Sequence, residues 1–225
     1  AETPIPAGDG TLVVGVTQSG ETADTLRALR RANENGARTL ALTNVRNSTA
    51  TRECDYTLYI RAGPEIGVAA TKTFSSQVAL LLLLVERIAG ADDETGERMR
   101  ALAALPAHVE ELLSGSAAER VSALHAGSDG YFFIGRGVDH PVALEGALKL
   151  KEISYEHAEG FPAGELKHGP LALVTGNTPV IAILSGPQDD ETLTNVEEVG
   201  ARGAPVLGVT AGEDTPAQLD EVLPI

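Results

Sequence analysis

Cysteine is almost absent from this sequence, and its near absence excludes several kinds of site. The 225 residues contain one cysteine, Cys54. A single cysteine rules out an internal disulfide and a multi-cysteine zinc centre. The five histidines show no cysteine or carboxylate spacing typical of metal ligands, so we expect no bound metal. The scarcity of cysteine favours a reducing, cytoplasmic setting.

Long apolar runs are also missing. The longest, residues 78–85, is far too short to cross a bilayer. The chain does not open with a basic stretch followed by an apolar one, so we expect no secretory signal. These observations predict a cytoplasmic protein without a membrane partner.

Positive charge is scarce as well. Lysine and arginine number 17 against 32 acidic residues, which gives a formal net charge of −15. Such a charge repels nucleic acid, although one local site can still bind a small anion. Only four lysines occur, at positions 72, 149, 151 and 167. An acidic, lysine-poor surface suggests a salt-adapted host. A free energy of unfolding that does not increase in molar salt would contradict this hypothesis.

The hydrophobic pattern of the first half predicts an α/β fold. Strands are expected at residues 11–17, 39–43 and 56–60, and helices at about 22–35 and 67–89. Short strands alternating with helices are typical of a parallel sheet with crossover helices.

The second half repeats the first with a constant offset of 167 residues. Residues 13–16 align with 180–183, and Thr43 aligns with Thr210. We therefore predict two tandem units, at residues 1–92 and 129–225, joined by a linker and a connecting helix at 93–128.

The same repeat indicates that each unit is incomplete. The second unit has an extra strand at 130–137 and a helix at about 141–158, whose counterparts would precede residue 1. Conversely, the counterpart of the 67–89 helix would begin beyond residue 225. We expect a fragment, in which the first unit lacks its first strand and helix and the second lacks its C-terminal helix and tail.

A polar turn between the first strand and the first helix is a candidate phosphate site. It offers the hydroxyls of Thr17, Ser19 and Thr22, the amide of Gln18, and the free backbone amides of a helix start. Gly20 permits close approach of the backbone to a ligand. No lysine is present, so the turn is not a Walker loop, and it suits a substrate's phosphate better than phosphoryl transfer.

An ordinary helix cap by Ser19 or Thr22 is the alternative interpretation. The repeat favours phosphate binding by the first unit. The matching turn at residues 184–189 has lost most hydroxyls, and Asp189 and Asp190 at its helix start would repel a phosphate.

Two further stretches carry groups that can move protons. Lys149 and Glu152 are three residues apart and share a helix face, whereas Lys151 points elsewhere. They form either a proton-transfer pair or a solvated ion pair. His168 lies in a turn rich in glycine and proline, where its ring either reaches a ligand or serves a structural role.

These motifs resemble a known family. The turn from Thr17 to Thr22, followed by Ala-Asp-Thr, resembles the phosphate loop of the sugar isomerase (SIS) domain family. Three blocks, at residues 63–72, 143–155 and 165–170, are similar to the glucosamine-6-phosphate synthases in particular. The resemblance extends over nearly the whole chain.

The resemblance implies a fold and an activity. In that family the isomerase half contains two SIS subdomains, forms a homodimer and receives ammonia from an N-terminal glutaminase domain. It converts fructose 6-phosphate to glucosamine 6-phosphate, with glutamine giving glutamate, and uses no metal or organic cofactor.

The resemblance also implies residue roles. Thr17, Gln18, Ser19 and Thr22 would hold the phosphate, with Thr17 replacing a serine common in the family. Val68, Ala69 and Ala70 would line the sugar through backbone contacts. Glu152 would move a proton between C1 and C2 with help from Lys149, and His168 would open the sugar ring from the partner subunit.

Some family features have no match in this sequence. A further serine-bearing phosphate turn, the C-terminal lysine that forms a Schiff base and the glutaminase cysteine are absent, and Cys54 lies in no such motif. We therefore expect no use of glutamine by this chain alone. Two alternatives remain open: a non-catalytic SIS module that binds a phosphosugar and regulates a partner, or a related sugar-phosphate deaminase or isomerase.

Overall fold

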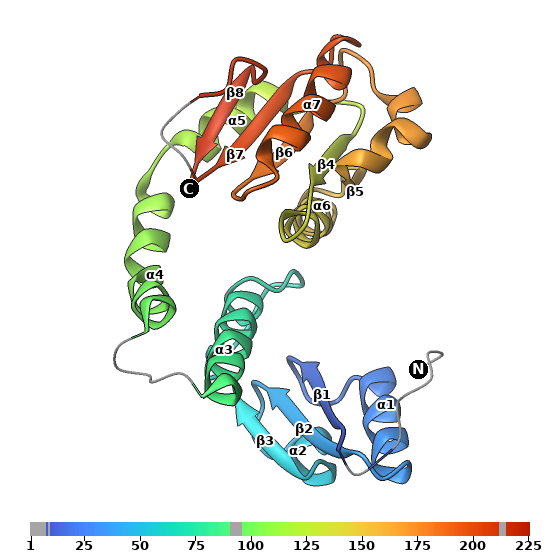
Figure 1. The fold of residues 1–225 in the computed structure, drawn as a ribbon, viewed down its shortest axis with the longest axis vertical. Coiled ribbons are helices and arrows are strands. Elements are labelled where there is room, and N and C mark those ends of the chain that lie inside the picture. Colours follow the sequence, from blue (N-terminus) through green and yellow to red (C-terminus); the bar gives the residue numbers. More distant parts are fainter. Residues whose placement is uncertain (1–7, 9, 91–95, 212–214) are drawn as a thin grey trace. The chain divides into compact units, whose positions relative to one another are not determined.

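The computed structural model describes residues 8, 10–90, 96–211 and 215–225. The chain divides into two compact units, residues 1–103 and 104–225. Each unit contains its own parallel sheet flanked by helices (Figure 1). The predicted α/β class is confirmed.

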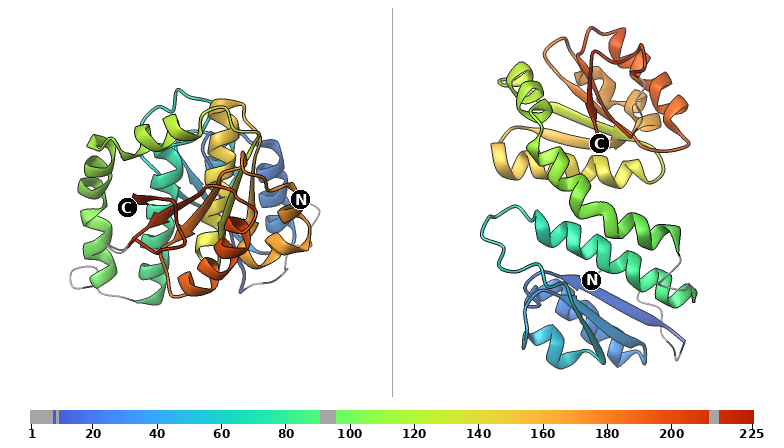
Figure 2. Two further views of the ribbon diagram at one scale, coloured as in Figure 1. Left: turned by 90° about the horizontal axis from the view of Figure 1, so that it is seen from above. Right: turned by 90° about the vertical axis from the view of Figure 1, so that its left-hand side faces the viewer.

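The first unit is a three-stranded parallel sheet in the order β1-β2-β3. Its elements are β1 (Leu12–Thr17), α1 (Ala23–Glu34), β2 (Arg38–Thr43), α2 (Thr49–Glu53), β3 (Tyr56–Tyr59) and α3 (Lys72–Ala89). Helices α1 and α2 lie on one face of the sheet (Figure 2, right). The apolar stripe of α1 is buried there through Leu26, Leu29 and Ala32.

The second unit is a five-stranded parallel sheet in the order β5-β4-β6-β7-β8. Its strands are β4 (Tyr131–Gly135), β5 (Ala158–Pro162), β6 (Val180–Leu184), β7 (Val206–Thr210) and β8 (Glu221–Pro224). Its helices are α5 (Ala117–His125), α6 (Asp139–Ser154) and α7 (Asp189–Gly200), with the 3-10 helices η1 (Ala163–His168) and η2 (Pro170–Leu173).

Both faces of this second sheet are covered. Helix α7 and η1 pack on the face that carries Ile134, Val180 and Ala182. Helices α5 and α6 pack on the face that carries Ile181 and Ile183. Alternate residues of β6 therefore enter two separate cores, which explains why this strand reads as a continuous apolar run.

The stretch predicted as linker and connecting helix contains two helices. Helix α4 (Glu97–Ser114) spans the boundary between the units, and α5 adds Val121 to the core of the second unit. Residues 93–95 of that stretch lie outside the described part of the chain. Within the described ranges, no helix combines the length and the apolar character that crossing a membrane requires.

The internal repeat is confirmed by the strand registers. Val13 pairs with Thr39 in the first sheet, and Val180 pairs with Val206 in the second, shifted by the same 167 residues. A shared polar contact accompanies this register. The carboxylate of Asp55 accepts the amide of Thr39 at 2.7 Å, and that of Asp220 accepts the amide of Val206 at 2.8 Å.

The structure corrects two predicted helices and adds a strand. The helix expected from residue 67 begins at Lys72, and the helix expected to reach residue 158 ends at Ser154, where Tyr155 adopts a left-handed conformation. Strand β5 was not predicted. Its Gly160 lies against α6 so closely that a Cβ there would come within 2.8 Å of the Leu144 Cα. Gly160 permits this close contact between helix and sheet. Because a glycine has no side chain, the strand lacks the alternating apolar pattern by which it could have been predicted.

Candidate functional site

The polar turn lies where the sequence places it, between the carboxyl end of β1 and the start of α1. Gly20 has a φ of 71°, which permits the sharp reversal of the chain. The Gly20 amide donates to the Thr17 hydroxyl at 3.1 Å, and the Glu21 amide donates to the Ser19 hydroxyl at 3.1 Å. The Thr17 and Thr22 hydroxyl oxygens lie 3.2 Å apart.

These contacts leave the hydroxyl proton of Ser19 for a ligand, and also that of either Thr17 or Thr22, because one of these two threonines donates to the other. A hydroxyl has one donor hydrogen and two acceptor positions, so accepting an amide proton keeps its own proton available. Thr22 is the N-cap residue of α1, but its side chain makes no capping hydrogen bond. The ordinary side-chain cap, considered above as an alternative, is therefore not formed. The first amides of α1 keep the orientation that suits an anion.

The equivalent turn of the second unit is occupied by the protein's own carboxylates. Asp139, only 4% exposed, accepts the Ser185 hydroxyl at 2.5 Å and the Ser185 amide at 3.3 Å. Asp189 accepts the Gly186 amide at 3.1 Å. Burial raises the pKa of Asp189, and the nearby charges of Asp139 and Asp190 raise it further. Internal carboxylates thus take the place that an anion would need.

Asp139 was missed in the sequence because it lies 46 residues from Ser185. The sequence assigned repulsion of a phosphate to Asp189 and Asp190. The structure gives the more direct role to Asp139, which reaches the turn from the start of α6.

A cavity of about 740 Å³ adjoins the turn in the first unit and includes Gln18 in its lining. Two arginines line it, and the Arg46 guanidinium lies 5.8 Å from the centroid of the Tyr59 ring. Asn44 fixes another wall, accepting the Ala62 amide at 3.0 Å and donating to the Gly63 carbonyl at 2.6 Å. The second arginine, Arg61, has a φ of 60°. Neither arginine was singled out from the sequence.

The loop between β3 and α3 carries the predicted sugar-lining residues. Val68 is 95% exposed, Ala69 is buried and Ala70 is half-buried. Glu65 anchors the loop by accepting the Thr73 hydroxyl at 2.7 Å and the amides of Thr73 and Thr71 at 3.1 and 3.2 Å. These hydrogen bonds, led by that of the Thr73 hydroxyl, lower the pKa of Glu65 to about 2.

The predicted proton-transfer pair forms on α6. Lys149 makes an ion pair with Glu152, and its Nζ lies 3.5 Å from a carboxylate oxygen of Glu145. The hydrogen bond with Glu152 is the main cause of a raised Lys149 pKa. The Lys149 side chain is only 22% exposed, so the pair is not a freely solvated one. Glu145, which lies on the same helix face, was not singled out from the sequence.

His168 lies at the end of η1 and is exposed. In the described part of the chain, no hydrogen bond or ion pair joins it to Lys149 or Glu152. The structure therefore groups the predicted residues in two places. The turn with Thr17, Ser19 and Thr22 belongs to the first unit, and Lys149 with Glu152 belongs to the second.

Metal ligands do not gather at either place. Across residues 8, 10–90, 96–211 and 215–225, no group of three or more histidine, cysteine or acidic side chains is arranged to hold a metal ion.

Comparison with known proteins identifies the family. The SIS domain model matches residues 5–87 and 127–223. The chain belongs to the SIS domain family. The two matched segments correspond to the two repeated units described above, and the predicted tandem SIS organisation is confirmed.

Two relatives of this SIS chain carry the same name. It is 54% identical over 221 residues to the glutamine–fructose-6-phosphate aminotransferase (isomerizing) of Halobacterium salinarum, covering 94% of this chain and 36% of that protein. It is 53% identical over 208 residues to the enzyme of the same name from Methanothermobacter thermautotrophicus, covering 92% of this chain and 34% of that protein. The SIS chain thus spans about a third of the length of these relatives.

A solved structure gives the same picture. The C-terminal domain of glucosamine-fructose-6-phosphate aminotransferase from Francisella tularensis superposes with a TM-score of 0.89 at 38% identity, covering 100% of this chain and 66% of that one.

Proposed function

We propose that this SIS chain is the isomerase part of a glutamine–fructose-6-phosphate aminotransferase. In that protein, a glutaminase domain supplies ammonia from glutamine, and the isomerase part turns fructose 6-phosphate into glucosamine 6-phosphate. The observation that carries the proposal is the Thr17–Thr22 turn, in which the Ser19 hydroxyl accepts a backbone amide and keeps its own proton for an anion, as does one hydroxyl of the Thr17–Thr22 pair. The high identity to relatives of that name supports it.

The phosphate is proposed to bind at Thr17, Gln18, Ser19 and Thr22. A dianion there receives hydroxyl and amide donors together with the amides at the start of α1. Val68, Ala69 and Ala70 contribute backbone contacts to the sugar. The loop that carries them is fixed at one end by the hydrogen bonds of Glu65, so it presents a defined backbone.

Glu152 is proposed as the general base of the isomerisation. A carboxylate takes a proton from one of the two carbons C1 and C2 and returns it to the other, which interconverts ketose and aldose forms. Lys149, held between Glu145 and Glu152, places a positive charge where the enediolate oxygen develops negative charge.

His168 is proposed to open the sugar ring in the site of a second copy, within a homodimer. Its exposure and the absence of a bond to the described Lys149 and Glu152 side chains of its own unit support this assignment. The chemistry needs no metal or organic cofactor, because proton transfer between adjacent carbons requires only a base and charge stabilisation.

The remaining assignments concern domain limits and setting. We propose SIS units at 1–92 and 129–225 with a connecting stretch at 93–128, in a cytoplasmic protein that binds no nucleic acid. The net charge of −15 supports a salt-adapted host. If so, the free energy of unfolding rises with molar potassium chloride because counterions screen the mutual repulsion of the carboxylates. Unfolding midpoints that do not change with salt would remove this assignment.

A deaminase acting on glucosamine 6-phosphate is the second candidate. The glucosamine-6-phosphate deaminase of Thermotoga maritima superposes with a TM-score of 0.77 at 27% identity, covering 93% of this chain and 63% of that one.

The experiment that tests the proposal measures calorimetric binding of fructose 6-phosphate and, by NMR in deuterated water, exchange of its C1 protons for deuterium. Binding with exchange supports the isomerase role. Binding without exchange favours a regulatory module, ammonia release from glucosamine 6-phosphate favours the deaminase, and no binding at all contradicts the proposal.

A further inference from the structure

Three acceptor groups of the Thr17–Thr22 turn, which we call the phosphate turn, are engaged by donors of the first unit. The Gln18 carbonyl accepts the Thr43 hydroxyl at 3.2 Å and the Asn44 amide at 3.1 Å. The Gly20 carbonyl accepts the Ala50 amide at 3.0 Å. The Glu21 carboxylate accepts the Thr49 amide at 2.7 Å. Acceptors that are engaged behind the turn cannot face an incoming anion, where they would repel it.

Two of these contacts join the turn to the start of α2, which has no side-chain cap of its own. Ser48 is its N-cap residue, yet the Ser48 hydroxyl makes no capping bond. Ser48 is 3% exposed, and within the described residues its hydroxyl has no hydrogen-bond partner. It lies directly against Gly20, where an added Cβ would be 2.1 Å from the Ser48 oxygen. The first amide of α2 is satisfied instead by Glu21, from 28 residues away.

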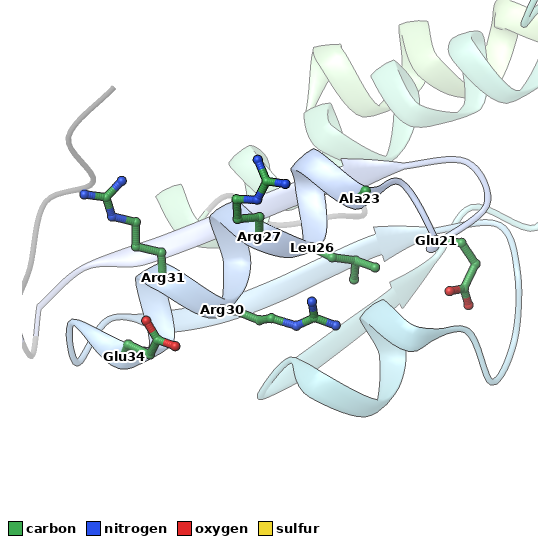
Figure 3. Close-up of a pocket in the computed structure, with 7 residues that line it drawn as sticks. All are labelled: Glu21, Ala23, Leu26, Arg27, Arg30, Arg31 and Glu34. Atoms are coloured by element: carbon green, nitrogen blue, oxygen red, sulfur yellow. The ribbon is translucent and has the colours of Figure 1, made fainter. Parts of the chain in front are cut away.

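Figure 3 shows how Glu21 is directed. Its side chain points from the end of the turn toward the side on which α2 lies, whereas Arg27 and Arg31 point the opposite way from α1. Arg30 also points toward α2, and its guanidinium pairs with Glu53 through two bonds of 2.7 and 2.8 Å. Helix α2 is thus tied at its start to the phosphate turn by Glu21 and at its end to α1 by Glu53.

We propose that Glu21 is a positioning residue for phosphosugar binding. By capping α2 it holds the turn with its donors facing the ligand and keeps its own negative charge away from the phosphate. This inference rests on the proposed function only for the identity of the ligand, because inorganic phosphate probes the same turn.

Electrostatic repulsion alone predicts the opposite effect of Glu21 on phosphate binding. A carboxylate beside an anion site repels the ligand, so its removal should tighten binding. Positioning predicts that removal weakens binding, and the sign of the change distinguishes the two roles.

The test is calorimetric titration of the chain with fructose 6-phosphate and, separately, with inorganic phosphate. We expect E21A to bind both ligands roughly tenfold more weakly, since an unsupported turn must be reordered on binding. E21Q should bind within about threefold of the original chain, because its amide oxygen still accepts the Thr49 amide.

T49P breaks the same bond from the other side. Thr49 is the first residue of α2, where proline fits the helix but lacks the amide, and Ser48 already has the extended backbone that proline requires before it. T49P should weaken binding as E21A does, and the double variant should be no weaker than either single one. The matched control E53A breaks the other tie of α2 and should leave both affinities unchanged.

Affinity that stays equal or rises in E21A, or that falls as much in E53A, overturns the inference. If the original chain binds phosphate but not fructose 6-phosphate, the proposed function fails, and Glu21 is judged on phosphate alone. If it binds neither ligand, both fail.

Discussion

Asp139 on α6 accepts two hydrogen bonds from Ser185, in the turn of the second unit that is equivalent to the proposed phosphate turn of the first. The two turns occupy equivalent positions in the repeated fold but differ in their hydrogen-bonding groups. One presents donors to solvent, whereas the other is already satisfied by an internal carboxylate. A ligand anion is therefore expected in one unit only.

This difference predicts binding stoichiometry. Calorimetry should give one fructose 6-phosphate per chain, because Asp139 and Asp189 occupy the donors of the second turn. D139A should lower the free energy of unfolding by roughly 1–3 kcal/mol, since the hydroxyl and the amide of Ser185 lose a charged acceptor. Two ligands per chain, or a D139A variant as stable in urea as the original, would contradict this interpretation.

Removing the hydroxyls of the first turn should weaken binding without unfolding the chain. S19A/T22A is expected to lose roughly 1–3 kcal/mol of binding free energy for each charged hydrogen bond that disappears. Titration with fructose 6-phosphate measures the loss. The control S122A removes an exposed hydroxyl on α5 and should bind normally. Unchanged affinity in the double variant would show that the phosphate binds elsewhere.

Glu65 predicts a pH dependence in acid. Its folded-state pKa of about 2 lies below the ordinary value of 4.5. The carboxylate therefore contributes stability that is complete above about pH 4.5 and is lost as the pH falls through 2. Between pH 5 and 2, the free energy of unfolding should fall more steeply with decreasing pH for the original chain than for E65Q. The control E34Q, at an exposed position on α1, should keep the original slope, and parallel curves for E65Q and the original would contradict the role of Glu65.

The sequence was informative where a pattern is local or repeated. The offset of 167 residues predicted the second unit, because the same strand registers need the same spacing of apolar residues. The Lys149–Glu152 contact followed from helical geometry alone. Contacts between distant segments left no comparable pattern. Asp139 with Ser185 and Glu21 with Thr49 each join residues many positions apart, and only the folded chain brings them together.

The proton-transfer assignment rests on Glu152 and has a clear kinetic consequence. E152Q keeps the shape of the side chain but cannot accept a proton, so exchange of the C1 protons of fructose 6-phosphate should fall by roughly 10²–10⁴-fold. Binding of fructose 6-phosphate should persist, because the phosphate turn belongs to the other unit. K151Q changes an exposed lysine on the same helix and should exchange at the original rate. A merely structural ion pair would instead reduce stability in E152Q and leave exchange per folded molecule unchanged. Measuring both the exchange rate and the stability therefore distinguishes a general base from a structural ion pair.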